Sequence, residues 1–201
     1  MIIKTEADLR KLYGFAKDKA VAKQLSKLEY HSRNFINYSP FLLLSTYSKD
    51  GQLDCSPRGG NAGFVKIIND NKIILADSKG NNRLDSLVNI IETKQIGCLF
   101  LIPGVDETLR VNGRALISTE LKYLELFSDF KIPPKSCIEI SINEVFLHCA
   151  KALMRSKLWD ESSKINREDF PSMGEMIKAQ LNLAEEAEDQ SKMMQRYLDE
   201  I

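Results

Sequence analysis

Residues 95–118, QIGCLFLIPGVDETLRVNGRALIS, predict two strands joined by a tight turn. The first eight residues are dense enough in apolar side chains to predict a strand buried on both faces. Pro103 and Gly104 are typical of a turn. From Thr108 onward apolar and polar residues alternate, which indicates a second strand with one face toward the core.

The other face of this second strand is polar. Its side chains are Thr108, Arg110, Asn112 and Arg114, and those facing the core are Leu109, Val111, Gly113 and Ala115. Two arginines four residues apart on one strand face lie about 13 Å apart at ~3.3 Å per residue. At most one of them therefore binds a given phosphate directly. A solvated sheet face is the alternative interpretation.

Further strands are expected on both sides of this pair. Apolar runs separated by turn residues predict them at residues 41–47, 53–56, 64–68, 72–76 and 136–148. The run from Pro57 to Asn61 is expected to break the second of these strands. Several short strands with hairpin turns, one inserted helix and flanking helices favour an α+β fold with a small barrel.

Helices are expected at both ends of the chain and between strands. Apolar spacing predicts them at residues 5–13, 17–35, 84–92, 119–130 and, as a long amphipathic stretch, 171–198. Thr5 and Thr119 are expected to cap two of them. The helix at 84–92 presents Leu84, Leu87, Val88 and Ile91 on one face. The last stretch has a stripe that must be buried on the barrel or across a dimer interface: Met173, Met176, Ile177, Leu181 and Ala184.

The loop DSKGNNRLD at residues 77–85 leads from a predicted strand into a predicted helix. Backbone N–H groups of a first helical turn, together with the helix dipole, favour an anion there. Lys79 and Arg83 add positive charge, and Ser78, Asn81 and Asn82 add neutral donors. The spacing is neither a Walker loop nor a dinucleotide fingerprint. A solvated loop with an Asn cap is the alternative.

The run Pro57-Arg58-Gly59-Gly60 is a further candidate. Two glycines permit positive φ or the close approach of a planar ligand to the backbone. A simple bulge or loop between barrel strands is the alternative interpretation.

Composition excludes several classes of protein. Lys plus Arg equals 28 and Asp plus Glu equals 28, so the net charge is zero, which argues against a general nucleic-acid binder. No apolar run approaches the ~20 residues of a membrane span, and the N-terminus lacks the apolar region of a signal peptide. The four cysteines form no C-x-x-C pair, so we expect neither a zinc site nor a disulfide framework. A cytoplasmic protein without a metal is the expectation.

No general acid–base pair stands out, so the catalytic residues are unassigned. His31 lies on a predicted helix among polar neighbours and is expected at the surface. His148 closes the last predicted strand and is a candidate to line a site. Hydride transfer needs no protein nucleophile, so the lack of a catalytic triad does not argue against redox chemistry.

Three runs occur in an order that resembles one family. They are residues 54–60 (DCSPRGG), the loop 77–85, and residues 100–115 (FLIPGVDETLRVNGRA). They resemble the pyridoxamine 5′-phosphate oxidase-like superfamily of flavin-nucleotide-binding split barrels, and within it the FMN-dependent subgroup. The similarity covers about residues 35–160.

The resemblance implies a mostly antiparallel Greek-key split β-barrel with flanking helices. It also implies a homodimer with FMN at the subunit interface. The chain then divides into N-terminal helices packed on the barrel (1–36), the FMN-binding barrel (37–160) and a C-terminal helical extension (161–201).

Site residues carry over by position. Arg58 matches the arginine that precedes the flavin face, and Asn82 with Arg83 matches the phosphate-binding loop, with Lys79 and Asn81 nearby. The motif of a polar residue, then Arg, then Gly matches Thr108, Arg110 and Gly113. The phosphate oxidase proper carries Gln at the position of Thr108, which has a shorter side chain.

The run HCAKALMRSKLW at residues 148–159 resembles the end motif of the subgroup. Lys151 and Arg155 share a helix face and are counted among the cofactor-binding candidates. Trp159 either covers a flavin or substrate, or packs the last helix.

The expected function is that of an FMN-dependent oxidoreductase acting on a small molecule. The phosphate candidates are Lys79, Asn82, Arg83 and Arg110, and either Arg58 or Arg114 is expected near the flavin N1 and O2 atoms. The alternatives are a flavin carrier or redox sensor without turnover, and a relative that binds deazaflavin F420 or haem.

Overall fold

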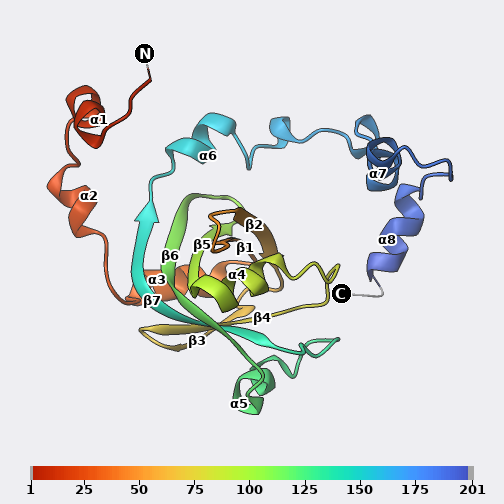
Figure 1. Cartoon of the computed structure of the whole chain (residues 1–201), viewed down its shortest axis with the longest axis horizontal. Helices are drawn as coiled ribbons and strands as arrows, with labels where there is room; N and C mark the ends of the chain where they lie inside the picture. The colour runs from red at the N-terminus through yellow and green to blue at the C-terminus, as the bar shows by residue number, and fades with distance from the viewer. Residues whose placement is uncertain (1, 199–201) are drawn as a thin grey trace.

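The structure, a computed structural model, describes residues 2–198. Its centre is one strongly curved seven-stranded sheet in the order β2-β1-β5-β6-β7-β4-β3, with every neighbouring pair antiparallel (Figure 1). The strands are β1 (Phe41–Tyr47), β2 (Leu53–Gly59), β3 (Val65–Asn69), β4 (Lys72–Ala76), β5 (Gln95–Ile102), β6 (Val105–Ser118) and β7 (Cys137–His148). The predicted α+β split barrel with flanking helices is confirmed.

The helices stand between strands and at both chain ends. They are α1 (Glu6–Tyr13), α2 (Asp18–Ala22), α3 (Tyr30–Tyr38), α4 (Asp85–Thr93), α5 (Leu121–Leu124), α6 (Lys151–Ser156), α7 (Met173–Leu181) and α8 (Gln190–Leu198), with short 3₁₀ turns at Glu125–Phe127, Glu161–Ser163 and Arg167–Asp169. Over residues 2–198 no helix is both long and apolar enough to cross a membrane.

The core lies on the concave side of the sheet. Leu42, Phe100, Leu109 and Ile140 are at most 1% exposed there, and α3 and α4 supply further apolar side chains. Burial of this apolar surface is the main term that stabilises the barrel.

Strand β2 is longer than predicted. It continues through Pro57 to Gly59, with Pro57 opposite Leu43 of β1. The expected break at Pro57 was wrong because β2 is an edge strand of the described sheet, where a residue without an N–H group costs no ladder hydrogen bond.

The helix expected over residues 17–35 is wrong. The structure has α2 and α3 with an extended segment between them, because tertiary partners take the backbone groups that a helix would use. Leu25 exchanges both backbone hydrogen bonds with Val145 of β7, at 2.9 and 2.8 Å, and the Leu28 N–H donates to Asp70 O. Glu29 and Ser32 then form a capping box that starts α3.

Three other helix predictions need correction. Thr5 caps α1 as predicted, whereas Glu120 rather than Thr119 precedes α5, and it makes no side-chain cap. The stretch 171–198 forms two short helices instead of one. On α4 the buried residues are Ser86, Leu87, Asn89 and Ile90, whereas Leu84, Val88 and Ile91 are exposed. Of the four apolar residues predicted on the buried face, only Leu87 is buried.

Strand β5 is buried on one face only. Ile96, Cys98 and Phe100 are buried, while Leu99 and Leu101 are half-buried. The prediction of burial on both faces was too strong, because the convex side of the sheet is only partly covered in a single chain.

Candidate functional site

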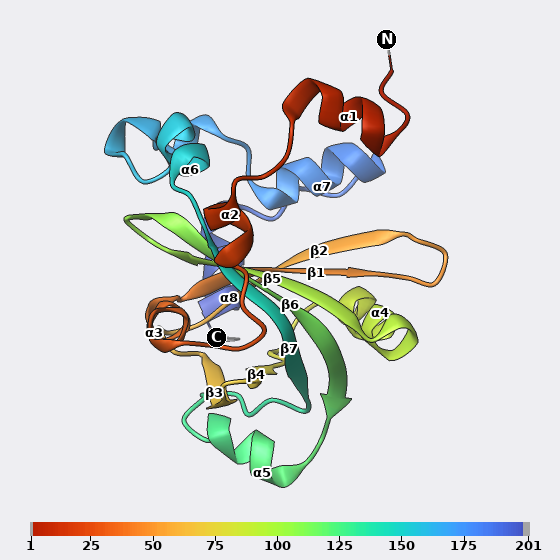
Figure 2. The ribbon, with the colours of Figure 1, turned by 90° about the vertical axis from the view of Figure 1, so that its left-hand side faces the viewer.

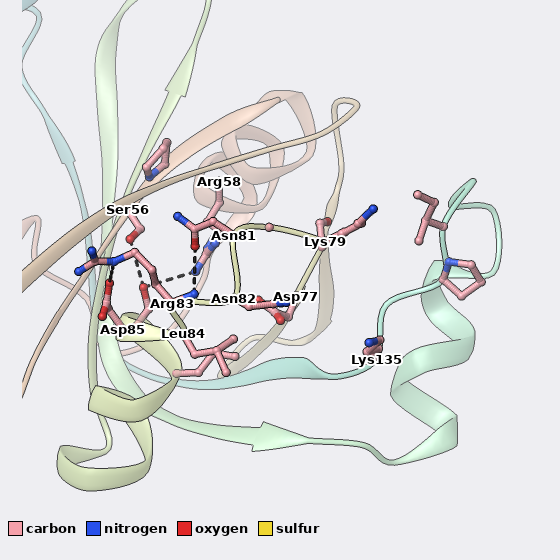
Figure 3. Close-up of a pocket in the computed structure, with 17 residues that line it drawn as sticks. Ser56, Arg58, Asp77, Lys79, Asn81, Asn82, Arg83, Leu84, Asp85 and Lys135 are labelled. Atoms are coloured by element: carbon pink, nitrogen blue, oxygen red, sulfur yellow. Dashed lines mark hydrogen bonds and ion pairs between the residues drawn. The ribbon is translucent and has the colours of Figure 1, made fainter. Parts of the chain in front are cut away.

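A cavity of about 390 Å³ opens where β2, the loop after β4 and the first turn of α4 meet (Figure 3). The segment between α5 and β7 closes its far side. The lining residues are Ser56, Pro57, Arg58, Asp77, Ser78, Lys79, Gly80, Asn81, Asn82, Arg83, Leu84, Asp85, Ser86, Leu87, Ile132, Pro133 and Lys135. The whole predicted anion loop and Arg58 thus share one cavity.

The loop enters α4 through two residues in the left-handed region. Asn82 and Leu84 both have φ of 59°. Asn81 Oδ1 accepts a 3.1 Å hydrogen bond from the Arg83 N–H, which lies before the helix. The N-cap position is Leu84 and not an Asn, and its apolar side chain cannot accept a hydrogen bond from the first turn. The N–H groups of that turn are left for a ligand.

Arg58 reaches the cavity from the concave face of β2. Its Nη2 donates a 3.4 Å hydrogen bond to Ser86 Oγ, whereas its buried Nε has no partner among the described residues. A buried donor without an acceptor costs free energy. An anion in this cavity would supply the missing acceptor.

The Asp54 carboxylate, behind the cavity, accepts hydrogen bonds from three hydroxyl groups. Asp54 Oδ2 accepts from Ser86 Oγ at 2.5 Å and from Thr46 Oγ1 at 3.4 Å, and Ser56 Oγ donates to both Asp54 oxygens at 3.1 Å. Asn89 Nδ2 donates to Thr46 Oγ1 at 3.0 Å. This chain of bonds fixes the first two turns of α4 against β1 and β2.

Positive charge exceeds negative charge around the cavity. Arg58, Lys79, Arg83 and Lys135 stand against Asp77 and Asp85, which leaves a lining charge of +2. A phosphate monoester carries up to two negative charges, so the lining matches a dianion.

The two carboxylates that line the cavity, Asp77 and Asp85, each interact with one of its arginines. Burial raises the pKa of Asp77, and the Arg58 charge opposes that rise. Arg83 Nε donates a 2.8 Å hydrogen bond to Asp85, which raises the pKa of the guanidinium. Arg83 is exposed at the cavity mouth, within reach of an incoming anion.

Several residues of the cavity and its wall were missed from sequence. Asp54 and Ser56 share one face of β2 with the predicted Arg58, and this period-two signal was present, but Pro57 was interpreted as a break. Ser86 and Lys135 lie in the cavity through tertiary packing, and the sequence prediction included neither.

The remaining predicted residues do not line this cavity. Arg58 pairs with Leu42, Leu42 with Phe100, and Phe100 with Leu109, so all four side chains share the concave face. Thr108, Arg110 and Arg114 alternate with these core positions and point to the convex face. Lys151 and Arg155 are exposed on α6.

A second polar group lies on that convex face. Thr108 pairs with His148, whose buried Nε2 has no partner within residues 2–198. The Arg110 guanidinium lies 5.3 Å from the centre of the Phe146 ring, and that ring lies 4.9 Å from the ring of His148. Within one chain the predicted strand residues therefore lie on opposite faces of the sheet: Arg58 is on the concave face, and Thr108, Arg110 and Arg114 are on the convex face.

Two other sequence predictions can be placed. His31 is exposed, as expected. Trp159 Nε1 donates a 3.0 Å hydrogen bond to Val105 O, so it packs the segment after α6 against the start of β6. Within the described chain no group of three or more His, Cys, Asp or Glu side chains is placed to hold a metal ion.

A curved antiparallel sheet with a positively charged cavity at the start of its inserted helix defines the chain as a split β-barrel protein. The pyridoxamine 5′-phosphate oxidase family matches residues 28–149, and the chain belongs to that family. A search of curated proteins found no match.

Solved structures resemble about three fifths of the chain. HupZ of Group A Streptococcus is 18% identical with a TM-score of 0.51, and the match covers 60% of this chain and 93% of HupZ. A putative pyridoxamine 5′-phosphate oxidase of Lactobacillus delbrueckii is 18% identical with a TM-score of 0.49, covering 62% and 98%. An F420 reductase is 13% identical with a TM-score of 0.43, covering 60% and 98%. At 18% identity the likeness to HupZ concerns the fold alone.

Proposed function

We propose that this protein binds FMN and is an FMN-dependent oxidoreductase acting on a small molecule. The observation that supports this most strongly is the cavity at the start of α4. It combines a lining charge of +2 with two features seen among residues 2–198: the start of α4 has no side-chain cap, and the buried Arg58 Nε has no acceptor.

The phosphate group would be held by cationic and neutral donors of the cavity. Arg58, Lys79, Arg83 and Lys135 supply charge, and the first-turn N–H groups of α4 supply directed hydrogen bonds. Ser78, Asn81 and Asn82 add neutral donors. When bound, FMN supplies the redox chemistry, and the protein supplies binding, orientation and electrostatics.

The two faces of the sheet support a homodimer with FMN at the subunit interface. Arg58 and the loop lie on the concave side, and Thr108, Arg110 and Arg114 lie on the convex side of the same chain. Contact of one flavin with both sets requires two chains, with the second set and α6 residues Lys151 and Arg155 coming from the partner. Because Arg58 is assigned to the phosphate, Arg114 is left as the candidate for the flavin N1 and O2 edge.

The proposed domain organisation keeps the barrel at residues 37–160 as the FMN-binding unit. Residues 1–36 and 161–201 flank it, and within the first segment Leu25, Leu28 and α3 contact the barrel in the single chain. All four cysteines are unpaired, which fits a reducing cytoplasm.

The identity of the ligand is the decisive measurement. The purified protein is expected to be yellow, and the mass of the compound released on denaturation is expected to be that of FMN. F420 or haem in the extract would contradict FMN binding and identify the alternative ligand. A colourless protein that takes up no FMN would refute the proposal. Bleaching by NADPH with turnover on an electron acceptor is expected of an enzyme, whereas bound FMN without turnover would indicate a carrier or sensor.

A further inference from the structure

Two helical arms extend from the barrel and leave apolar side chains exposed. The N-terminal arm is residues 2–27, and the C-terminal arm is residues 160–198; both lie wholly outside the family match at 28–149. In Figure 1 they run to opposite sides of the barrel, with α1 and α2 on one side and α7 and α8 on the other. Figure 2 shows α1 and α7 standing away from the sheet.

The chain exposes far more surface than a compact monomer. Its accessible surface is 14105 Å² for a mass of 22.8 kDa. A compact monomeric protein of this mass exposes roughly 9600 Å². The excess of about 4500 Å² is several times the ~800 Å² that each partner buries in a standard protein interface.

Part of this excess is apolar and ordered along helices. On the N-terminal arm Leu12 and Phe15 are 64% and 83% exposed, and α1 has no buried residue. On the C-terminal arm Met173, Ile177 and Leu181 follow each other at four-residue spacing, and all three are exposed. These are surfaces that association would bury.

The C-terminal arm is a built structure of its own. Gly174 packs so closely on the Glu188 backbone that a Cβ atom there would lie 2.3 Å from Glu188 O. Arg196 forms a 2.8 Å ion pair with Glu188, and Ser172 with Glu175 forms a capping box. The apolar stripe therefore belongs to a packed helical hairpin.

Both arms are tied to the barrel. At the base of the N-terminal arm, Leu25 pairs with Val145 of β7, and Lys23 Nζ donates to Leu147 O at 2.7 Å. Just before the C-terminal arm, Trp159 donates to Val105 O, and at the far end of that arm Lys131 Nζ donates to Leu198 O at 3.0 Å. These contacts hold the two arms on opposite sides of the barrel (Figure 1), so they do not cover each other within one chain.

The charges of the two arms are complementary. Residues 2–27 contain seven Lys and Arg against three Asp and Glu, a net charge of +4. Residues 160–198 contain five Lys and Arg against nine Asp and Glu, a net charge of −4. Oppositely charged surfaces attract and steer association, and like-charged surfaces disfavour it.

We infer that a second copy of this chain covers the exposed apolar surface of both arms. The N-terminal arm of one chain packs on the C-terminal arm of its partner. A two-fold dimer makes this contact twice, which pairs +4 with −4 at both places. It also covers both apolar stripes. The inference concerns assembly and stands independently of FMN binding.

Charge reversal with complementation tests the contact on full-length protein. In one variant, Lys4→Glu, Lys17→Glu and Lys19→Glu make the N-terminal arm negative. In the other, Asp169→Lys, Glu185→Lys and Glu186→Lys make the C-terminal arm positive. All six side chains are exposed. Lys4→Arg, Lys17→Arg and Lys19→Arg form the matched control that retains charge.

Sedimentation velocity at low ionic strength is the readout, because salt screens exposed charges. Wild type and the Arg control are expected at twice the 22.8 kDa of the chain. Each reversed variant alone is expected to dimerise at least about tenfold more weakly. An equimolar mixture of the two is expected to recover wild-type affinity as a heterodimer, because both of its arm contacts again join opposite charges.

A monomeric wild type overturns the inference, as do reversed variants that dimerise like wild type. Weakened variants whose mixture does not recover also overturn it, since that result indicates contact within one chain or an effect on folding. Circular dichroism of each variant alone identifies the folding effect. Bound FMN, measured separately by absorbance, keeps this outcome distinct from failure of the proposed function.

Discussion

Ser86 Oγ donates a 2.5 Å hydrogen bond to Asp54 Oδ2 and ties the first turn of α4 to strand β2. The same hydroxyl accepts the 3.4 Å hydrogen bond from Arg58 Nη2. Ser86 is 3% exposed, so these bonds are shielded from water. The pair positions both the helix start and the arginine that face the cavity.

Ser86→Ala is expected to lower the free energy of unfolding by about 1–3 kcal/mol, because Asp54 loses a donor in a partly buried site. Urea unfolding measures this. Val88→Ala is the matched control on the exposed face of the same helix and is expected to change stability by less than about 0.5 kcal/mol. Equal losses in the two variants would contradict the role of the Asp54 bond.

Arg83→Ala is expected to weaken FMN binding roughly 10- to 100-fold, the usual value of a charge-assisted hydrogen bond. Quenching of FMN fluorescence during titration measures the affinity. Lys122→Ala removes an exposed charge on α5, away from the cavity, and is expected to bind FMN like wild type. Unchanged affinity in Arg83→Ala would refute its assignment to the phosphate.

His148 gives the protein a predicted sensitivity to acid. Burial, then the positive charges of Arg110 and Lys23, lowers the pKa of its imidazole. The unfolded chain then binds the proton more tightly than the folded chain. Stability from this group is complete above the ordinary value of about 6.5 and falls as pH drops below it toward the lowered folded pKa.

His148→Gln is therefore expected to lose less stability than wild type between pH 7.5 and pH 5.5, measured as the urea midpoint at each pH. His31→Gln removes the exposed histidine and serves as the control, with a wild-type pH response expected. The histidine assignment fails if His148→Gln and wild type show the same loss.

Gly113→Ala is expected to destabilise the barrel by about 3 kcal/mol or more, since overpacking a tight site forces the backbone to move. A Cβ atom at Gly113 would lie 2.1 Å from Ser141 O, at the irregularity between β6 and β7. Gly80→Ala is the matched control, because a Cβ there meets no atom within 4 Å. Thermal unfolding compares the two, and a small effect at Gly113 would show that the strands can separate locally.

Local patterns predicted much of the barrel and part of the site. Alternation along residues 108–115 placed Leu109 and Val111 in the core and Arg110 outside it, because successive strand residues point to opposite faces. The loop 77–85 was predicted to bind an anion from its charges and its place before a helix. These properties depend on neighbours in sequence, so one sequence suffices to find them.

Tertiary structure decided the rest. Leu25 leaves a helical pattern because Val145 supplies its backbone partner, and the polar network of Asp54 selects the buried face of α4. Ser86 meets Asp54 and Arg58 of β2, which are 32 and 28 residues away along the chain. Lys135 reaches the cavity from the segment before β7, and Arg58 is separated from Arg110 by the sheet itself. Such contacts depend on which strands become neighbours, and no sequence period carries that information.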